Sequence, residues 1–249
     1  MSDLAKRSIV GVALIAGALL LAVVGGWPFA LFVAAGATVM YVEWTRMVGS
    51  WGIAWKLFCF IYCLAPALSL LWIRERAEFE GIGQGFDLLV WVFIVVWATD
   101  IGAFFAGRAI GGPKLAPSIS PNKTIAGLVG GALSAGLLSY VWVTFTTLPT
   151  LLVWLAIPFA AMAQVGDLFE SGLKRRAGVK DSGTFLPGHG GLLDRIDGLV
   201  PVAVLTAALM AANWLSTAAP SRSSARPARS ARRPSTSSSA IPTSSRSLR

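Results

Sequence analysis

Seven apolar runs, each close to the length that crosses a bilayer, limit how this chain can fold. A membrane-spanning helix needs about 20 mostly apolar residues, and in lipid only helices or closed barrels satisfy the backbone polar groups. The sequence therefore predicts an all-α polytopic membrane protein of about seven transmembrane helices, or up to nine if the longer runs divide. The predicted spans lie near residues 8–25, 28–45, 52–73, 86–106, 124–146, 149–167 and 196–215.

The composition agrees with a membrane protein. Hydrophobic residues make up 55% of the chain and charged residues 13%, whereas a soluble domain carries about 25% charged residues. The net charge of +9 comes mostly from seven arginines after residue 220. The rest of the chain is nearly neutral, so the basic balance does not indicate a nucleic-acid partner.

The polar connections between the predicted spans are expected to face one side. Lys6 and Arg7 place the amino terminus in the cytoplasm by the positive-inside rule. Counting spans from there puts the connections 107–123 and 168–195, both rich in glycine, proline and charge, on the cytoplasmic face. We divide the chain into N-terminal transmembrane helices (1–85), a catalytic transmembrane domain (86–216) and an Arg- and Ser-rich tail (217–249) that is expected to be disordered.

Four polar residues would share one face if the sixth helix continues past its apolar part. Asp167, Glu170, Ser171 and Lys174 stand at i, i+3, i+4 and i+7. Two carboxylates, a hydroxyl and an ammonium on one face can hold a divalent cation and a phosphate. The alternative is a solvated helix end with an ordinary i,i+4 ion pair, which contributes little to stability.

A second carboxylate pair, Asp194 and Asp197, stands at the start of the last apolar run. One aspartate there would serve as a helix cap. Two aspartates beside Arg195 exceed what a cap requires. Mg²⁺ prefers carboxylate and phosphate oxygens, so Asp167 and Asp194, on neighbouring helix ends, are predicted to share a metal site.

Glycines precede this second pair. Gly188, Gly190 and Gly191 allow the backbone to approach a ligand closely. His189, the one histidine of the chain, lies among them and is predicted to contact a polar group or a phosphate. It has no Ser and Asp arrangement around it in the sequence, so it is not predicted to act as a base.

The connection 107–123 supplies positive charge through Arg108, Lys114 and Lys123. The segment 120–124 is predicted to open the fifth helix, with Pro121 near its start and free N–H groups available for an anion. The alternative is a basic loop that only follows the topology rule. Neither a Walker A pattern nor GxGxxG is present in the sequence.

These motifs together resemble the signature of the phosphatidate cytidylyltransferase (CDP-diacylglycerol synthase) family. The resemblance covers roughly residues 86–215 and departs from the family at Ala126, where Glu or Gln is common. The residues that carry it are Ser171-x-Leu-Lys174-Arg175, Lys180-Asp181 and Pro187-x-His189-Gly190-Gly191-x-x-Asp194-Arg195-x-Asp197, with 115–124 similar to a second family motif and Asp100 to Gly107 to a third.

The resemblance implies a multi-pass enzyme of the bacterial inner membrane, usually a homodimer, whose active site faces the cytoplasm and contacts membrane lipid. Its reaction joins CTP to phosphatidic acid and releases pyrophosphate, with Mg²⁺ and a monovalent cation such as K⁺ beside it. The family's metal ligands map onto Asp167 and Asp194, with Asp197 beside them, and its signature serine and lysine onto Ser171 and Lys174. The predicted substrate contacts are Arg108, Lys114, Ser120, Lys123, Thr124, Arg175, Lys180, Asp181, His189, Gly190, Gly191 and Arg195.

Two other functions stay open at this point. A CTP-dependent polyprenol kinase would use an alcohol acceptor and would need a base. An ion-coupled transporter or cation channel would line its path with Asp100 and Asp167. Against transport, the charges cluster in the connections rather than at mid-membrane, and no inverted repeat is apparent.

Overall fold

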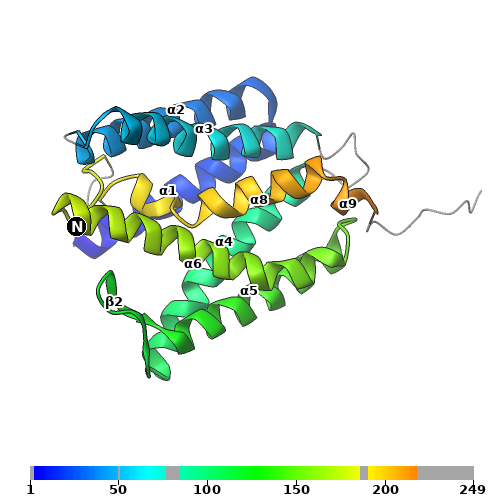
Figure 1. The fold of residues 1–249 in the computed structure, drawn as a ribbon. Coiled ribbons are helices and arrows are strands. Elements are labelled where there is room, and N and C mark those ends of the chain that lie inside the picture. The colour runs from blue at the N-terminus through cyan, green and yellow to red at the C-terminus, as the bar shows by residue number, and fades with distance from the viewer. Residues whose placement is uncertain (1–2, 50, 77–84, 186–189, 218–249) are drawn as a thin grey trace, which may run out of the picture. The chain divides into compact units, whose positions relative to one another are not determined.

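A computed structural model describes residues 3–49, 51–76, 85–185 and 190–217 of the chain, and the described part is mostly helical (Figure 1). Residues 218–249 of the predicted tail (217–249) lie outside the described residues, as do residues 77–84. The helices are α1 (Asp3–Val24), α2 (Gly26–Met47), α3 (Ile53–Arg76), α4 (Gly85–Ala109), α5 (Ile125–Phe145), α6 (Leu151–Ala177), α7 (Leu193–Ile196), α8 (Leu199–Ala211) and α9 (Trp214–Thr217).

Five of the helices in the described part, α2 to α6, are long and apolar enough to cross a membrane. The apolar part of α1 and the whole of α8 are shorter, at Gly11–Val24 and Leu199–Ala211. The predicted helical membrane architecture therefore holds, but the count of seven spans is not confirmed.

One connection differs in kind from the prediction. The residues between α4 and α5 form a two-stranded antiparallel hairpin of β1 (Lys114–Ala116) and β2 (Ser120–Thr124). Pro121 therefore lies in a strand, and α5 begins only at Ile125. The expected anion site at a proline-started helix is not formed by these residues.

The turn between α1 and α2 is held by charged residues of α3. Gly25, with φ of +65°, separates the two helices. Arg74 donates from Nε to the carbonyl of Ala22 at 2.7 Å, and Glu75 Oε1 accepts from the N–H of Gly26 at 3.1 Å. These bonds satisfy backbone groups that helix ends leave unpaired, so this end of the bundle uses its charges for structure.

Helix α4 lies at the centre of the main apolar core, with Trp91 and Val95 fully buried. It packs along α5, which in turn packs against α6. A buried polar chain crosses all three helices: Trp91 Nε1 donates to Ser139 Oγ at 2.6 Å, and Ser139 donates to the carbonyl of Leu152 at 3.2 Å. The chain satisfies polar groups that lipid could not.

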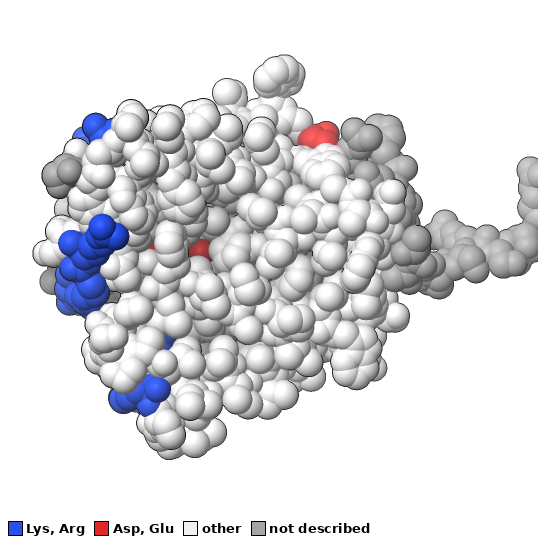
Figure 2. All heavy atoms as spheres, in the orientation of Figure 1, with Lys and Arg blue, Asp and Glu red and all other residues white. Residues whose placement is uncertain are grey.

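A second apolar cluster joins α2, α3, α6 and α7 near the opposite end of the bundle from the α1–α2 turn. It includes Trp44, Cys59, Leu173 and Leu193, all buried. Lysines and arginines gather at this same end, next to the hairpin, while the broad flank between the two ends is nearly free of charge in the view shown (Figure 2). The fold thus gathers the ends of α2, α4 and α6, and the start of α5, at one polar end.

Close packing of α4 on α5 predicts a contrast between two glycines of α5. A Cβ at Gly130 would collide with Ala106, whereas a Cβ at Gly136 would meet Ile157 at an ordinary 3.5 Å. Gly130→Ala should lower the thermal unfolding midpoint in detergent, by the equivalent of about 1–3 kcal/mol for overpacking. Gly136→Ala, the control, should leave it unchanged or raise it, because alanine favours helix. Equal midpoints for both variants would contradict the packing described for α4 and α5.

Candidate active site at the polar helix ends

The candidate site is built on α6, which continues well past its apolar part to Ala177. The condition for a shared polar face is therefore met. Ser171 Oγ donates to Asp167 Oδ1 at 3.3 Å, and Lys174 Nζ lies 3.2 Å from Glu170 Oε2. Helix α6 ends at Gly178, whose φ of +71° is the left-handed conformation that glycine adopts without strain.

Asp194 is the most heavily hydrogen-bonded of the predicted metal ligands. Its Oδ1 lies 2.7 Å from Lys174 Nζ, and its Oδ2 accepts from the N–H groups of Ser182 at 3.0 Å and Gly191 at 2.9 Å. Burial opposes ionisation of Asp194, but the hydrogen bonds from Lys174 and from the Gly191 N–H prevail and hold its pKa below its usual range. Asp194 is thus an ionised anchor between α6 and the segment that precedes α7.

The hairpin meets α6 at the other side of the site. Lys123 of β2 pairs with Asp167 Oδ2 at 2.5 Å. Arg175 Nε donates to the carbonyl of Ile119, between the two strands, at 3.4 Å. These contacts confirm the prediction that the two polar connections come together, and they do so over the last three turns of α6.

Three further carboxylates, those of Asp100, Glu170 and Asp197, lie near these ion pairs. Asp197 follows α7, and its pKa is raised to about 7, first by burial and then by the negative charge of Asp167. Asp100 of α4 lies within electrostatic reach of Asp167, Lys123 and Arg195. Glu170 is fully buried, and within the described residues its Oε1 has no hydrogen-bond partner.

The donor set fits a hard divalent cation in kind. Asp167, Glu170 and Asp197 offer carboxylate oxygens, and the buried, unpartnered Oε1 of Glu170 is the sort of atom that a cation satisfies. Among the described residues, however, no three such side chains are already gathered closely enough to hold a metal ion. Mg²⁺ usually keeps water and substrate phosphate in its coordination shell, so one or two carboxylates suffice for such a site.

The remaining basic residues lie around the rim. Arg108, Lys114 and Lys180 are exposed, and within the described part of the chain they make no ion pair. Arg195 is exposed on α7, and Asp181 is exposed in the segment after α6. The structure therefore brings Lys123 and Lys174 into the acidic cluster and leaves Arg108, Lys114 and Lys180 exposed at its rim.

Two hairpin residues proposed as substrate contacts have structural partners. Thr124 is the N-cap of α5, and its hydroxyl accepts from the N–H of Gly127 at 3.0 Å. Ser120 pairs with Ala116 across the hairpin. Capping already accounts for the position of Thr124, whereas a contact of either residue with substrate stays a prediction.

The glycine segment is described in part. Gly190 has a φ of +81°, and Gly191 places its N–H on Asp194. The prediction for His189 falls on residues 186–189, which lie outside the described residues.

Sequence reasoning missed three polar residues around the site: the buried Glu43 and Ser182, and the half-buried Tyr62. Glu43 of α2 accepts hydrogen bonds from Ser182 Oγ and from the backbone of the segment before α7. Tyr62 of α3 is half-buried with its hydroxyl oxygen enclosed, and Asp197 and Glu170 lie within electrostatic reach of that hydroxyl. A charged residue inside an apolar run is a functional signal in membrane proteins, and Glu43 carries that signal in the sequence.

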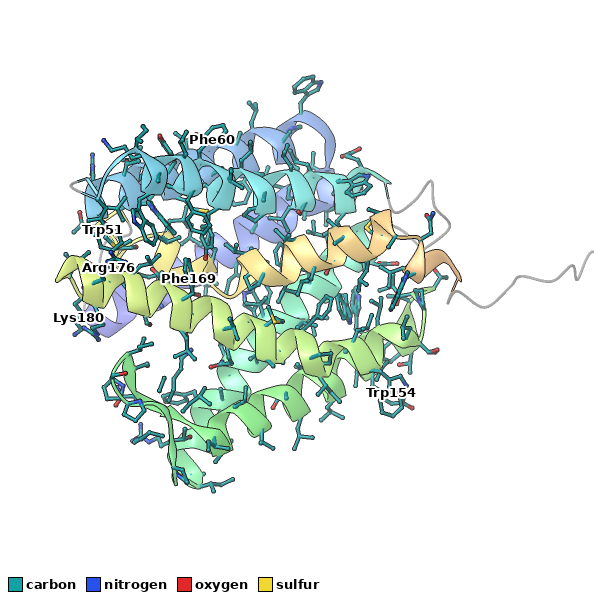
Figure 3. All side chains as sticks on the ribbon, in the orientation of Figure 1. Trp51, Phe60, Trp154, Phe169, Arg176 and Lys180 are labelled. Atoms are coloured by element: carbon teal, nitrogen blue, oxygen red, sulfur yellow. The ribbon has the colours of Figure 1, made fainter. Side chains whose placement is uncertain are left out.

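Aromatic residues fix the end of α6 against α3. Arg176 lies over the rings of Trp51, at 4.7 Å, and Trp55, at 5.3 Å (Figure 3). Phe169 packs with Tyr62 at a centroid distance of 5.6 Å. Cation–π and aromatic contacts add to the burial of these rings, so they fix the charged last turn of α6 against the start of α3.

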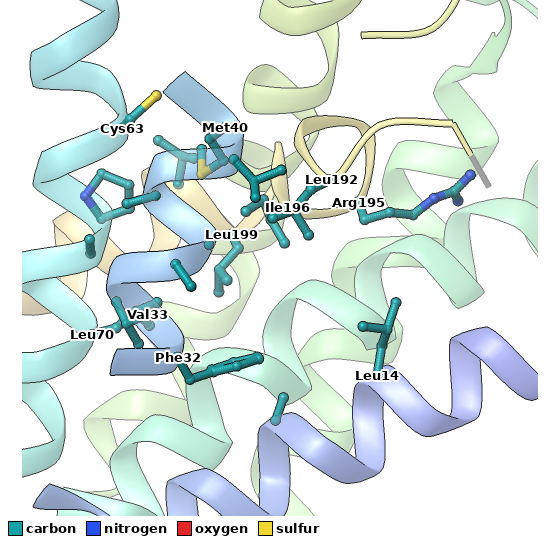
Figure 4. Close-up of a pocket in the computed structure, with 18 of the residues that line it drawn as sticks. Leu14, Phe32, Val33, Met40, Cys63, Leu70, Leu192, Arg195, Ile196 and Leu199 are labelled. Atoms are coloured by element: carbon teal, nitrogen blue, oxygen red, sulfur yellow. The ribbon is translucent and has the colours of Figure 1, made fainter. Parts of the chain in front are cut away.

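An apolar cavity of about 330 Å³ lies among the helices, with Leu192, Arg195 and Ile196 of the α7 region in its lining (Figure 4). Side chains of α1, α2, α3, α4 and α8 line it, among them Phe32, Val33 and Leu70. Within the described lining Arg195 is the one charged residue, and it lies at the end near α7. Arg195 is also within electrostatic reach of Asp100 in the acidic cluster, so the apolar cavity and the charged cluster adjoin at Arg195.

The sequence of the chain was compared with families of known proteins. A profile of the cytidylyltransferase family matches residues 50–213. The chain belongs to the cytidylyltransferase family. The matched range contains the hairpin, the whole of α6 and the carboxylates Asp167, Asp194 and Asp197.

Similar curated proteins carry the name phosphatidate cytidylyltransferase. That of Brucella suis biovar 1 (strain 1330) is 44% identical over 179 residues, which cover 70% of this chain and 62% of the relative. That of Staphylococcus saprophyticus is 45% identical over 152 residues, 60% of this chain and 58% of the relative. That of Haemophilus influenzae is 42% identical over 150 residues. The chain thus spans about three fifths of the length of the Brucella relative.

Proposed function

We propose that this protein transfers the cytidylyl group of CTP to phosphatidic acid, giving CDP-diacylglycerol and pyrophosphate. The observation that carries the proposal is the ion-paired cluster of Lys123, Asp167, Lys174 and Asp194 beside an apolar cavity. A lipid that ends in a phosphate needs both environments at once. The names of the relatives support the same substrates.

The proposed reaction needs no covalent intermediate with the protein. A phosphate oxygen of phosphatidic acid attacks the α-phosphorus of CTP, and the bond from that phosphorus to the bridging oxygen of the β-phosphate breaks. Pyrophosphate leaves with the electron pair of that bond. The attacking phosphate is already anionic near neutral pH, so no general base is required. Positioning and charge neutralisation supply most of the catalysis in such transfers.

The basic residues are arranged for that neutralisation. Lys123 and Lys174 lie inside the acidic cluster, each held by a carboxylate. When triphosphate enters, these ammonium groups can turn from carboxylate to phosphate over a short distance. Arg108, Lys114, Lys180 and Arg175 lie at the exposed rim, where they would attract the anionic nucleotide.

Mg²⁺ is proposed as the cofactor, with Asp167 and Asp197 as its protein ligands alongside substrate phosphates. When bound, it would neutralise charge on the triphosphate and on the leaving pyrophosphate. Asp194 serves as a ligand only if it gives up its bond with Lys174. A monovalent cation such as K⁺ beside this site is part of the same proposal.

The apolar cavity is proposed to take an acyl chain of the lipid substrate. Its volume of about 330 Å³ is at the lower end of the range for ligand pockets. Arg195 at its end would meet the lipid phosphate, and Arg195 also lies within electrostatic reach of Asp100 in the acidic cluster. The phosphate would therefore be held where the cavity meets the charged site.

The cellular setting belongs to the same proposal. Five helices long and apolar enough to cross a bilayer support a membrane location. The bacterial relatives and the positive-inside count support an inner-membrane enzyme whose site faces the cytoplasm. Homodimer formation rests on the family resemblance.

The reaction predicts where label from CTP will travel. Purified protein in detergent, given phosphatidic acid and Mg²⁺, should transfer cytidine label from CTP into lipid and release pyrophosphate. Asp167→Asn should lower that turnover by about 100-fold or more, because it removes charge aimed at the reacting phosphates. Asp87→Asn, a matched change in the first turn of α4, should leave it near normal.

Other label patterns would overturn the proposal. Entry of the γ-phosphate alone into lipid would indicate a kinase, and entry of neither label would leave transport as the better account. Near-normal turnover in Asp167→Asn would remove Asp167 from the metal site while leaving the reaction itself standing.

The cavity predicts a substrate-dependent effect of filling it. Gly36 lines the cavity, and a Cβ there would meet only Leu192 at 3.9 Å, so a larger side chain can enter the open space. Gly36→Phe should raise KM for long-chain phosphatidic acid by about tenfold, the loss of a few buried methylenes. It should change KM for a short-chain, water-soluble analogue by less than about twofold. Gly17→Phe on α1, where a Cβ meets nothing within 4 Å, is the control. Equal effects on both substrates would place the acyl chain elsewhere.

A further inference from the structure

Glu43 is a buried carboxylate that lies outside the part of the chain matched by the family profile. It lies near the end of α2, before the matched range 50–213, and it is 4% exposed. The flanks of α2 are mostly apolar. A carboxylate in such a place is costly unless hydrogen bonds stabilise it, so its partners decide what it does.

Within the described part of the chain, three hydrogen bonds reach Glu43, and they come from one segment. We define the anchored loop as residues 182–185 and 190–193, which are part of the described connection from α6 to α7 together with Leu193, the first residue of α7. Glu43 Oε1 accepts from the N–H of Leu192 at 3.0 Å, and Oε2 accepts from the N–H of Leu193 at 2.9 Å. Ser182 Oγ donates to Oε2 at 3.3 Å. One carboxylate on α2 thus holds both ends of the anchored loop.

The anchored loop passes so close to Glu43 that it has room only for glycine at two points. A Cβ at Gly183 would lie 2.7 Å from Glu43 Oε1, and a Cβ at Gly191 would lie 2.7 Å from Oε2. Such contacts are shorter than side chains tolerate. The carboxylate and the two glycines therefore form one fitted unit.

The same loop residues also bind Asp194. The hydroxyl of Ser182 donates a hydrogen bond to Glu43, and the backbone N–H of Ser182 donates one to Asp194. Gly191 packs against Glu43 and donates its N–H to Asp194. Asp194 in turn holds Lys174 at 2.7 Å. A continuous set of contacts therefore runs from Glu43 through the anchored loop to the charged site.

We propose that Glu43 is a positioning residue for the cytidylyl transfer: it fixes the anchored loop so that Asp194 and Lys174 face the pair of Asp167 and Lys123. The inference rests on the proposed function. It adds to that function a residue of α2 that touches no substrate and acts through the anchored loop.

If Glu43 only stabilised the fold, replacing it would lower the thermal unfolding midpoint. A positioning role predicts instead that the loop is released while the fold persists. Replacing a buried charge by an apolar residue of similar size is often neutral or stabilising, provided that its partners can find other bonds. Glu43→Leu should therefore leave the bundle folded while it releases the anchored loop. In Glu43→Gln an NH₂ group replaces one oxygen and faces a backbone N–H, so one of the backbone bonds is lost.

The test combines kinetics, thermal unfolding and hydrogen exchange on the purified full chain. Glu43→Gln should lower kcat by about tenfold, the usual loss for one hydrogen bond to a charged group, and Glu43→Leu by more. Both should raise amide exchange in the anchored loop and leave the unfolding midpoint within a few degrees of wild type. Thr45→Ala is the control, because the Thr45 hydroxyl bonds only to carbonyls of its own helix. It should change none of the three measurements.

Ser182→Ala completes a double-mutant cycle. If Ser182 acts through Glu43, the combined variant should lose less activity than the two single losses multiplied together. Wild-type kcat and loop exchange in Glu43→Gln and Glu43→Leu would overturn the inference. So would a collapse of the unfolding midpoint in both variants, which would make Glu43 a folding residue. If the wild-type protein transfers no cytidine label, the proposed function fails, while loop exchange still reports whether Glu43 holds the loop.

Discussion

The described structure depends on the neutralisation of charge at the polar end of α6. Lys174 lies between Glu170 and Asp194, and Lys123 reaches Asp167 from the hairpin. An unpaired charge in a buried, low-dielectric place costs several kcal/mol, so each pair holds its two elements together. Because the partners come from α6, the hairpin and α7, satisfying these charges assembles the site.

This constraint explains why the ion-paired residues of the candidate site gather at one end of the described bundle. At the other end Arg74 and Glu75 are used up in capping the turn between α1 and α2. The flanks between the ends are apolar and suit lipid. Within the described residues, the paired basic and acidic side chains of the site gather where α4 and α6 end, and there Arg195 lines the apolar cavity.

Much of the fold could be predicted because an apolar run of bilayer length can adopt few structures other than a membrane-spanning helix. The polar face from Asp167 to Lys174 follows from helical spacing once α6 continues, and it does. The hairpin could not be predicted, because its strands are only three and five residues long. Glu43 was missed because its partners lie about 140–150 positions away in the chain. The pairing of Lys174 with Asp194 depends on the path of the loop between them, which spacing does not reveal.

The meeting of the hairpin with α6 is the central claim, and a designed disulfide tests it most directly. A Cβ at Gly172 would lie 4.0 Å from Ile119 Cγ2, so a side chain at position 172 of α6 would touch the side chain at position 119 of the hairpin. Ile119→Cys with Gly172→Cys should cross-link under mild oxidation in membranes. Ile119→Cys with Gly136→Cys, which pairs the hairpin with a site that packs on Ile157, should not. Cross-linking of the first pair no faster than that of the control would contradict the convergence of the two polar connections.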